Sequence, residues 1–207
     1  MVYSDRTSAG RALGAHLTHL RARHPLVLGL PRGGVPVAAA VREMIGGDLD
    51  ILLVRKLGVP WQPELALGAI GEDGVRVFNP EVLAQVDIPA RQLAAIEARE
   101  HAELERRRQV LRGPADPIPL AGRAVVIVDD GMATGATVLV ACRVARLHQP
   151  VRITVAVPVS STEAMRRVAA EADEVICPWV SSTLSGVGGA YLDFHQLADA
   201  EVTALLR

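Results

Sequence analysis

The stretch VVIVDDGMATGAT, from Val125 to Thr137, says most about the fold of this chain. Four branched apolar residues run into two adjacent aspartates, Asp129 and Asp130, and a loop of small residues follows them. An apolar run without alternation indicates a strand that is buried on both faces, as in a parallel sheet covered by helices. Ligands of such sheets bind beyond the carboxyl ends of the strands, so we expect the two acids at a binding edge.

The rest of the chain repeats this pattern of apolar runs separated by helical periods. We therefore predict an α/β fold with a Rossmann-like parallel-sheet core and helices on both faces. The segments LALGAI and VRVFN, around the turn Gly71–Gly74, predict a β-hairpin over Leu65–Asn79. The expected strands are residues 26–30, 51–54, 124–130, 151–159 and 174–178, and the expected helices are residues 8–23, 35–45, 89–112, 136–147, 162–172 and a last one from about 199.

Composition narrows the class of protein. Half of the residues are hydrophobic but only 3% are aromatic, so we expect a core of mainly Ala, Val, Leu and Ile. The net charge of −1 gives no support for general nucleic-acid binding. We see no secretory leader and no apolar run near the ~20 residues of a membrane helix, so we expect a cytoplasmic protein. The two cysteines, Cys142 and Cys177, are too few for a disulfide framework or a zinc cluster.

Three known motif classes compete for the acid pair, and each lacks an essential residue. An NTPase needs a phosphate loop of the form G-x-x-x-x-G-K-[ST], but the single lysine, Lys56, stands in VRKLG. A receiver domain has a similar acid pair and needs a later lysine, yet residues 131–207 contain none. A dinucleotide site needs G-x-G-x-x-G, whereas Gly131 and Gly135 give only G-x-x-x-G. A tight strand-to-helix turn with solvated acids stays open as a purely structural interpretation.

A sugar-phosphate site explains every position of the stretch. The two carboxylates can accept hydrogen bonds from two ribose hydroxyls, or hold a magnesium ion directly or through water. The small residues allow backbone N–H groups to turn inward around a phosphate, and Thr134 and Thr137 add hydroxyl donors. The helix that begins near Ala136 points its positive end at the same anion.

The same stretch resembles the 5-phosphoribosyl-1-pyrophosphate (PRPP) signature of the type I phosphoribosyltransferases, and the likeness in strand and loop order extends over Leu26–Pro178. The resemblance implies an enzyme that uses PRPP and Mg²⁺ to transfer a phosphoribosyl group to a nitrogenous base, with release of pyrophosphate. Asp129 and Asp130 match the acids that hold the ribose hydroxyls. The 5′-phosphate loop of the family matches Gly131, Met132, Ala133, Thr134, Gly135, Ala136 and Thr137.

Two further segments match the pyrophosphate side of such a site. The loop Pro31, Arg32, Gly33 and Gly34 follows the first core strand, where the family binds pyrophosphate through the backbone. Arg55 and Lys56 match the basic position after the second strand. Lys56 is the only lysine among 22 basic residues, and its compact charge suits a pyrophosphate oxygen. The resemblance thus assigns Arg32 and Lys56, with the two acids, to catalysis; a simple glycine turn and a lysine retained by chance remain the alternatives.

The resemblance also divides the chain, as one domain over 1–207, into a core at about 26–178, a flexible hairpin at about 60–80, and a small hood that recognises the acceptor. The hood candidate is 179–196, with the segment 1–11 as a possible addition. Trp179, Tyr191 and Phe194 could stack on a base, and Asp193 or His195 could handle a proton. Alternatively, these rings pack the C-terminal helix. The family resemblance further implies a homo-oligomer.

Two functions other than catalysis stay open. Some proteins of this fold keep the PRPP motif and act as non-catalytic PRPP sensors. A pure assembly protein with a vestigial site is the third hypothesis. The sequence leaves the acceptor base unspecified.

Overall fold

The computed structural model describes residues 2–184 and 186–206, and its centre is a five-stranded parallel sheet. The strand order is β2 (Asp48–Ile51), β1 (Leu26–Gly29), β6 (Ala124–Val128), β7 (Arg152–Ala156) and β9 (Glu174–Ile176). Strand β6, which carries the apolar run of the signature, lies in the middle and pairs in parallel with β1 and β7. The predicted fold class is therefore confirmed.

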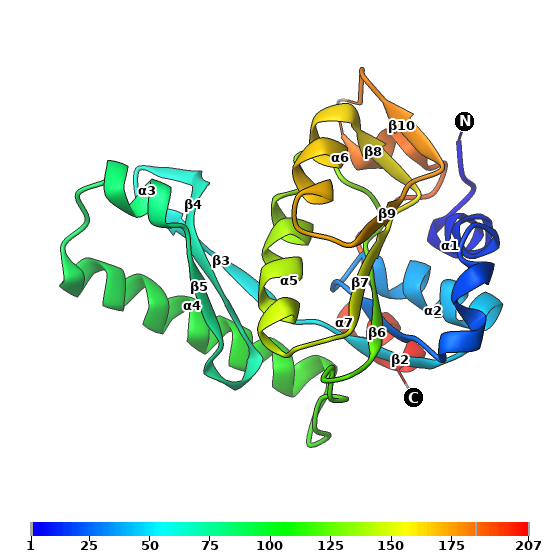
Figure 1. The fold of residues 1–207 in the computed structure, drawn as a ribbon, viewed down its shortest axis with the longest axis horizontal. Helices are drawn as coiled ribbons and strands as arrows, with labels where there is room; N and C mark the ends of the chain where they lie inside the picture. Colours follow the sequence, from blue (N-terminus) through cyan, green and yellow to red (C-terminus); the bar gives the residue numbers. More distant parts are fainter. Residues whose placement is uncertain (1, 185, 207) are drawn as a thin grey trace.

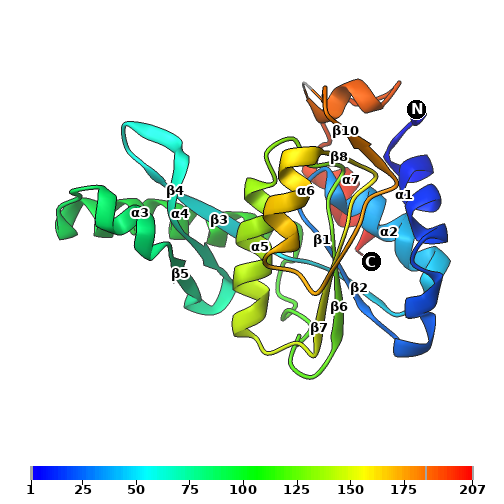
Figure 2. The same ribbon diagram turned by 45° about the horizontal axis from the view of Figure 1, so that its top comes forward.

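Helices cover both faces of this sheet (Figures 1 and 2). Helices α1 (Arg6–Ala15) and α2 (Gly34–Ile45) pack on one face, where Val126 and Val128 of β6 point. Helices α5 (Ala136–Leu147) and α6 (Thr162–Ala169) pack on the other, over Val125 and Ile127. Because both sets of side chains are buried, the strand shows no apolar–polar alternation in its sequence.

Three predicted elements are divided in the structure. The helix expected over 8–23 ends at Ala15, and a 3₁₀ helix, η1 (Thr18–Arg23), follows it. That tighter turn brings the guanidinium of Arg21 to the carbonyl oxygen of Met44, at 2.7 Å, near the end of α2. The apolar run expected as one strand over 51–54 spans two sheets, since β2 ends at Ile51 and β3 begins at Val54.

The strand expected over 151–159 is also two strands. Strand β7 ends at Ala156, and β8 (Val159–Ser161) pairs in parallel with β10 (Trp179–Ser181) in a separate two-stranded sheet. Pro158 lies between β7 and β8, and a proline has no backbone N–H to continue a ladder. The small sheet supports the loop after β6, because Met132 forms an isolated bridge with Ser160.

Residues 54–111 form an arm that projects from the body (Figure 1). Its antiparallel sheet contains β3 (Val54–Val59), β4 (Gln62–Gly71) and β5 (Arg76–Phe78), and the predicted hairpin is confirmed as β4 and β5 around a 3₁₀ turn, η2 (Glu72–Gly74). Helices α3 (Pro80–Gln85) and α4 (Ala90–Leu111) follow. Apolar side chains of α4, Ile96 and Leu104 among them, share one buried cluster with the arm sheet.

A buried ion network ties the arm to the sheet. Arg112, just after α4, has a side chain that is 4% exposed and donates to Asp50 of β2 and, at 3.1 Å, to Glu72 of η2. Its guanidinium also donates to the carbonyl oxygen of Ile51 at 3.0 Å. Burial raises the pKa of Glu72, although Arg112 pulls it down. One arginine thus joins the last turn of the arm, its hairpin and the edge strand.

The C-terminal part closes the fold with a short 3₁₀ helix, η3 (Val187–Ala190), and helix α7 (Asp199–Leu205). Val202 of α7 and the preceding Leu197 belong to the apolar cluster of the arm. Helix α7 therefore packs between the arm and the body. In the described part of the chain, no helix combines the length and the apolar character needed to cross a membrane.

Candidate functional site

The acid pair and the PRGG loop meet at one edge of the sheet. Asp129 and Asp130 follow β6, while Pro31–Gly34 follows β1, and these two strands are parallel neighbours. A Cβ atom on Gly33 would lie 2.0 Å from the Oδ2 atom of Asp130, and one on Gly34 would lie 2.5 Å from the carbonyl oxygen of Val128. Only glycine allows this close approach of the two loops. The peptide between Pro31 and Arg32 is cis.

Arg6, from the first turn of α1, is the cation that contacts the acid pair. Its Nε atom donates to Oδ2 of Asp130 at 2.9 Å, and its Nη1 atom donates to the carbonyl oxygen of His195 at 3.0 Å. The guanidinium carbon lies 4.0 Å from the centroid of the Phe194 ring, and the residue is 9% exposed. Sequence reasoning did not single out Arg6. The one available signal was a cation in the first turn of a helix, where the helix dipole disfavours it unless it has a tertiary partner.

Burial controls the charge of the two acids. It raises the pKa of Asp129 well above 3.8, and the neighbouring Asp130 raises it further. Burial also raises the pKa of Asp130, while Arg6 lowers it. Asp129 accepts the backbone N–H of Asp130 through Oδ1 at 2.9 Å. A ligand that brings hydroxyl donors or positive charge to the two carboxylates therefore stabilises their ionised forms.

A magnesium ion fits this donor set only together with a ligand. Carboxylate oxygens suit Mg²⁺, which proteins usually hold with one or two carboxylates plus substrate phosphates and water. Asp129 and Asp130 supply the carboxylates. No group of three or more His, Cys, Asp or Glu side chains within the described residues could form a complete protein cage.

The loop 131–137 is fastened at its start and open in its middle. The N–H of Met132 donates to the carbonyl oxygen of Val159 at 2.9 Å, and Ser161 Oγ donates to the carbonyl oxygen of Ala133 at 2.7 Å. Gly135 has φ of +72°, a left-handed conformation that starts α5. Thr134 is exposed, and its Oγ1 atom accepts the N–H of Ala136 at 3.4 Å. The exposed part of the loop thus lies at the positive end of α5.

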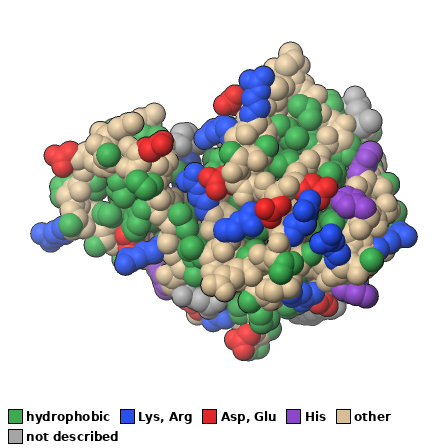
Figure 3. Space-filling view, in the orientation of Figure 1, with side chains coloured by type: hydrophobic (Ala, Val, Ile, Leu, Met, Phe, Trp, Pro, Cys, Tyr) green, Lys and Arg blue, Asp and Glu red, His purple; other side chains and the backbone are tan. Residues whose placement is uncertain are grey.

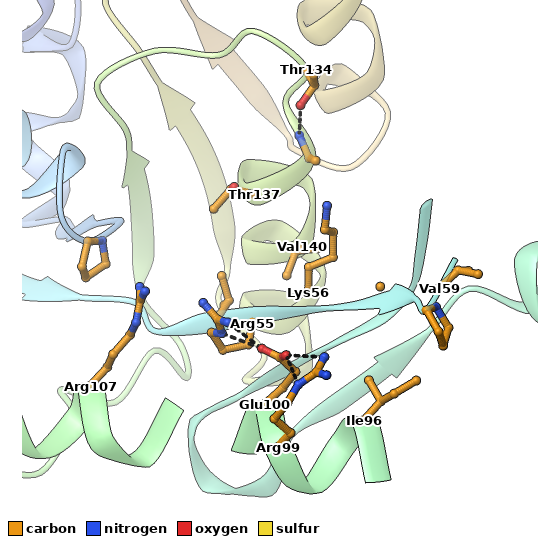
Figure 4. A pocket seen from close by; sticks show the side chains of 15 residues that line it. Arg55, Lys56, Val59, Ile96, Arg99, Glu100, Arg107, Thr134, Thr137 and Val140 are labelled. Atoms are coloured by element: carbon orange, nitrogen blue, oxygen red, sulfur yellow. Dashed lines mark hydrogen bonds and ion pairs between the residues drawn. The ribbon is translucent and has the colours of Figure 1, made fainter. Parts of the chain in front are cut away.

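A cavity of about 730 Å³ brings three of the predicted groups together. Its lining includes Pro31 from the PRGG loop, Arg55 and Lys56 from β3, and Thr134, Ala136 and Thr137 at the start of α5. This volume lies within the ~300–1,000 Å³ typical of small-molecule sites. Asp129 and Asp130 are not part of the lining and adjoin it through PRGG. Figure 4 shows Lys56 pointing toward α5 across this space.

The two basic segments differ from the predicted geometry. Arg55 and Lys56 lie within β3 of the arm, not at the end of a core strand. The guanidinium of Arg55 donates to Oε2 of the buried Glu100, on α4, at 2.9 and 2.6 Å. The guanidinium of Arg32 lies 3.7 Å from Asp199 of α7. The backbone of PRGG, not the side chain of Arg32, therefore adjoins the acid pair.

The predicted acceptor residues form a cluster against the N-terminal segment. The buried Tyr191 donates its hydroxyl to the carbonyl oxygen of Asp130 at 2.6 Å, and burial raises its pKa. Its ring stacks on Phe194 with centroids 5.1 Å apart and lies 5.8 Å from the ring of Tyr3. Trp179 is half-buried, with its ring 6.4 Å from that of Tyr3. The contacts observed for these rings are with Tyr3, Arg6 and the carbonyl oxygen of Asp130.

The exposed Asp193 and His195 interact with each other. His195 Nδ1 lies 2.9 Å from Oδ1 of Asp193, and its Nε2 lies 3.2 Å from Oε1 of Glu201. These two carboxylates raise the pKa of His195.

Comparison with known proteins shows which family the chain resembles. The family model described as "Phosphoribosyl transferase domain" matches residues 8–192. A Mycobacterium tuberculosis (strain H37Rv) protein named "Putative phosphoribosyl transferase Rv0571c" is 48% identical over 205 residues, which are 99% of this chain and 46% of that protein. The chain thus spans about half the length of this relative. A crystal structure of the protein TT1426 from Thermus thermophilus has 44% sequence identity and a TM-score of 0.92, over 100% of this chain and 98% of that one.

The matched residues include the PRGG loop, the arm and the acid motif, and the parallel sheet brings the PRGG loop and the acid pair to the same edge. The chain belongs to the type I phosphoribosyltransferase family.

Proposed function

We propose that this chain transfers the phosphoribosyl group of PRPP to a nitrogenous base or a similar acceptor, with Mg²⁺, and releases pyrophosphate. The observation that carries the proposal is the meeting of the acid pair with the PRGG loop on neighbouring strands, beside the cavity that Lys56 and Thr137 share. Phosphate, ribose and pyrophosphate groups of one PRPP molecule would then each find a suitable partner.

The residues take separate parts in the proposed binding mode. The 5′-phosphate lies on the loop 131–137, whose backbone N–H groups, hydroxyls and helix end attract an anion. Asp129 and Asp130 accept hydrogen bonds from the ribose hydroxyls. Pyrophosphate lies on the backbone of 31–34, with Arg55 and Lys56 as its cations. Mg²⁺, when bound near the acids, neutralises charge on the phosphate oxygens.

The proposed reaction is a displacement at the anomeric carbon with inversion. The bond from that carbon to the pyrophosphate oxygen breaks, and a bond to the acceptor nitrogen forms, through a state with positive charge on the ribose. Asp129 and Asp130 favour that charge, while Arg32 and Lys56 favour the departing pyrophosphate. The hairpin at 60–80 is proposed to close over the site and exclude water, the competing acceptor.

The acceptor is proposed to bind beside the hood segment 179–196, with the segment 1–11. Phe194 and Trp179 provide the rings that are partly exposed, and Tyr191 supports Phe194 from behind. Asp193, held by His195, is the proposed proton-handling group. We further propose, from the family resemblance, that the protein is cytoplasmic and forms a homo-oligomer.

The direct test is an assay of pyrophosphate release. The protein is incubated with PRPP, Mg²⁺ and a panel of purine and pyrimidine bases, and one base should give a rate well above that without acceptor. The double variant Asp129→Asn, Asp130→Asn should lose PRPP binding or turnover. A double variant that transfers or hydrolyses PRPP at the wild-type rate would exclude the assignment of the acids.

One observation favours a non-catalytic PRPP sensor as the second candidate. Asp130 is already paired with Arg6, and Arg55 with Glu100, so two proposed substrate contacts are engaged by the protein itself. A sensor would bind PRPP with Mg²⁺ and release no pyrophosphate with any base. An assembly protein with a vestigial site would show no thermal stabilisation by PRPP at all.

A further inference from the structure

Helix α4 of the arm presents several arginines to the body. Arg99 and Arg107 line the cavity of about 730 Å³ from the side of α4, across from Lys56 and Thr137 (Figure 4). In the space-filling view, Lys and Arg side chains gather where the arm meets the body (Figure 3). The family resemblance assigns no role to this helix, so its charges have no function yet in the proposed site.

The acids on α4 are too few to neutralise these arginines. Glu100 pairs with both Arg55, at 2.6 Å, and Arg99, at 3.0 Å. Glu103 likewise pairs with both Arg106, at 2.8 Å, and Arg107, at 2.9 Å. Each carboxylate therefore serves two guanidinium groups, and each cluster keeps an excess positive charge beside the cavity. An anion is the ligand class that such an excess favours.

Arg107 lies where it could bind such an anion. Its Nε atom donates to Oε1 of Glu103 at 2.9 Å, which leaves the end of the guanidinium, with one N–H of each terminal nitrogen, for a ligand, and the side chain is 37% exposed. Arg107 lines the large cavity together with Pro31 and also a second cavity, of about 110 Å³, together with Arg32. It thus shares one cavity with Pro31 and the other with Arg32, the first two residues of the PRGG loop.

We propose that Arg107 is a phosphate-binding residue, which α4 supplies to the pyrophosphate group from the wall opposite α5. The inference rests on the proposed function, because it assumes that pyrophosphate lies on PRGG. A guanidinium offers two parallel N–H donors to phosphate oxygens, a geometry that a lysine ammonium does not reproduce. Glu103 acts as a positioning residue, since it orients the guanidinium through Nε.

The test compares Arg107→Ala with Arg108→Ala. Arg108 is the next residue, pairs with Glu105 at 3.0 Å in the same way, and lines neither of the two cavities. Binding of inorganic pyrophosphate with Mg²⁺, and of PRPP with Mg²⁺, is measured by calorimetry. We expect Arg107→Ala to weaken both about 10- to 100-fold, and Arg108→Ala to match the wild type.

Two further measurements separate binding from folding. Arg107→Lys should recover part of the lost affinity, because it restores a charge without the planar fork; a purely structural role would give no such order among the variants. Thermal unfolding of Arg107→Ala should agree with that of Arg108→Ala. If Arg107→Ala or, should it fail to fold, Arg107→Lys binds pyrophosphate as tightly as the wild type, the inference is wrong. If the wild type binds neither ligand, the proposed function itself fails.

Discussion

Arg6 forms a salt bridge with Asp130 at 2.9 Å, and removal of its charge should destabilise the protein. Arg6→Met keeps the aliphatic stem beside Phe194 and removes the guanidinium from the buried Asp130. A buried charge that loses its partner typically destabilises a protein by about 3–5 kcal/mol. We expect a loss of that order in the free energy of unfolding, measured with urea.

The matched control for this prediction is Arg11→Met. Arg11 lies on the same helix and is exposed. Its substitution should change the free energy of unfolding by no more than about 0.5 kcal/mol. Equal effects of the two substitutions would show that the Arg6–Asp130 pair contributes nothing specific.

Asp129 should make the free energy of unfolding of the ligand-free protein fall as the pH rises. Its pKa is raised by burial above 3.8, so the folded state holds the proton more tightly than the unfolded chain does. This stabilising contribution is complete below pH 3.8 and is lost as the pH rises through the raised pKa. Asp129→Asn removes the titration and keeps an oxygen for the N–H of Asp130.

The variant Asp129→Asn should therefore become more stable than the wild type as the pH rises. The measurement is the free energy of unfolding across pH 5 to 9, without Mg²⁺ or PRPP, for both proteins. A difference between them that stays constant over this range would contradict the prediction.

At the residue scale, the sequence predicts best those groups of site residues that lie close together in the chain. The acids, the glycines and the small loop lie within two short segments, and their residue types alone predict a site for a phosphate and a ribose. The contact of Arg6 with Asp130 was not predictable, because the two residues are 124 positions apart and a cation in the first turn of a helix does not indicate which residue it pairs with. The contact of Tyr191 with the acid loop was also missed, because the two are distant in sequence. Its aromatic ring suggested stacking on a base, whereas its hydroxyl donates a hydrogen bond to the carbonyl oxygen of Asp130.

At the element scale, one buried arginine, Arg112, links the arm to the edge strand of the sheet. Arg112→Met would leave the carboxylates of Asp50 and Glu72 without their shared cation. We expect a loss of about 3–5 kcal/mol in the free energy of unfolding, by the same physical argument. Hydrogen exchange should also become faster in β4 and β5, because Glu72 belongs to the turn between them.

Arg76→Ala is the control for the arm. Arg76 lies in the same arm and forms an exposed pair with Glu97 at 3.3 Å. Exposed pairs contribute about 0–1 kcal/mol, so exchange in the hairpin should stay unchanged. If Arg112→Met behaves like this control, the ion network does not hold the arm.

In the arm, the hydrophobic pattern of the sequence predicts the individual elements but not the sheet to which each strand belongs. The hairpin was predictable from its turn and its strand-forming residues, and α4 from its charged helical pattern. The apolar run at 51–54 could not reveal that the chain passes from one sheet to another within it. Leu52 and Leu53 are buried between the two sheets, so their sequence is as apolar as that of a core strand. That passage decides where Arg55 and Lys56 lie, and it places them on a strand of the arm.

For the whole molecule, a ligand that binds only the folded state must raise its stability. At a free PRPP concentration of 100 times Kd with Mg²⁺, the gain is about 2.7 kcal/mol. For a chain of this size we expect the unfolding temperature to rise by roughly 5–10 °C. The measurement is thermal unfolding with PRPP and Mg²⁺, and ribose 5-phosphate at equal concentration serves as the weaker comparison. An unchanged unfolding temperature with PRPP would contradict the proposed binding.

The fold class was the most predictable property at this scale. A parallel sheet buries its strands on both faces, and that burial leaves a direct mark on the sequence as unbroken apolar runs such as 125–128. The cavity between the arm and α5 leaves no such mark. It depends on how α4 lies across the body, and this is decided by contacts between segments that are distant in sequence.

The N-terminal segment is joined to the segment that follows η3 beside the acid pair. The N–H of Tyr3 donates to the carbonyl oxygen of Ala190 at 2.8 Å, and the N–H of Leu192 donates to that of Tyr3 at 2.9 Å. During translation, Tyr3 and Arg6 are synthesised long before their hydrogen-bond partners in the rest of the chain. Asp129 and Asp130 are likewise synthesised before Tyr191, whose hydroxyl donates to the carbonyl oxygen of Asp130. A chain that stops before Ala190 therefore lacks both the contact between Tyr191 and Asp130 and the backbone hydrogen bonds that hold Tyr3.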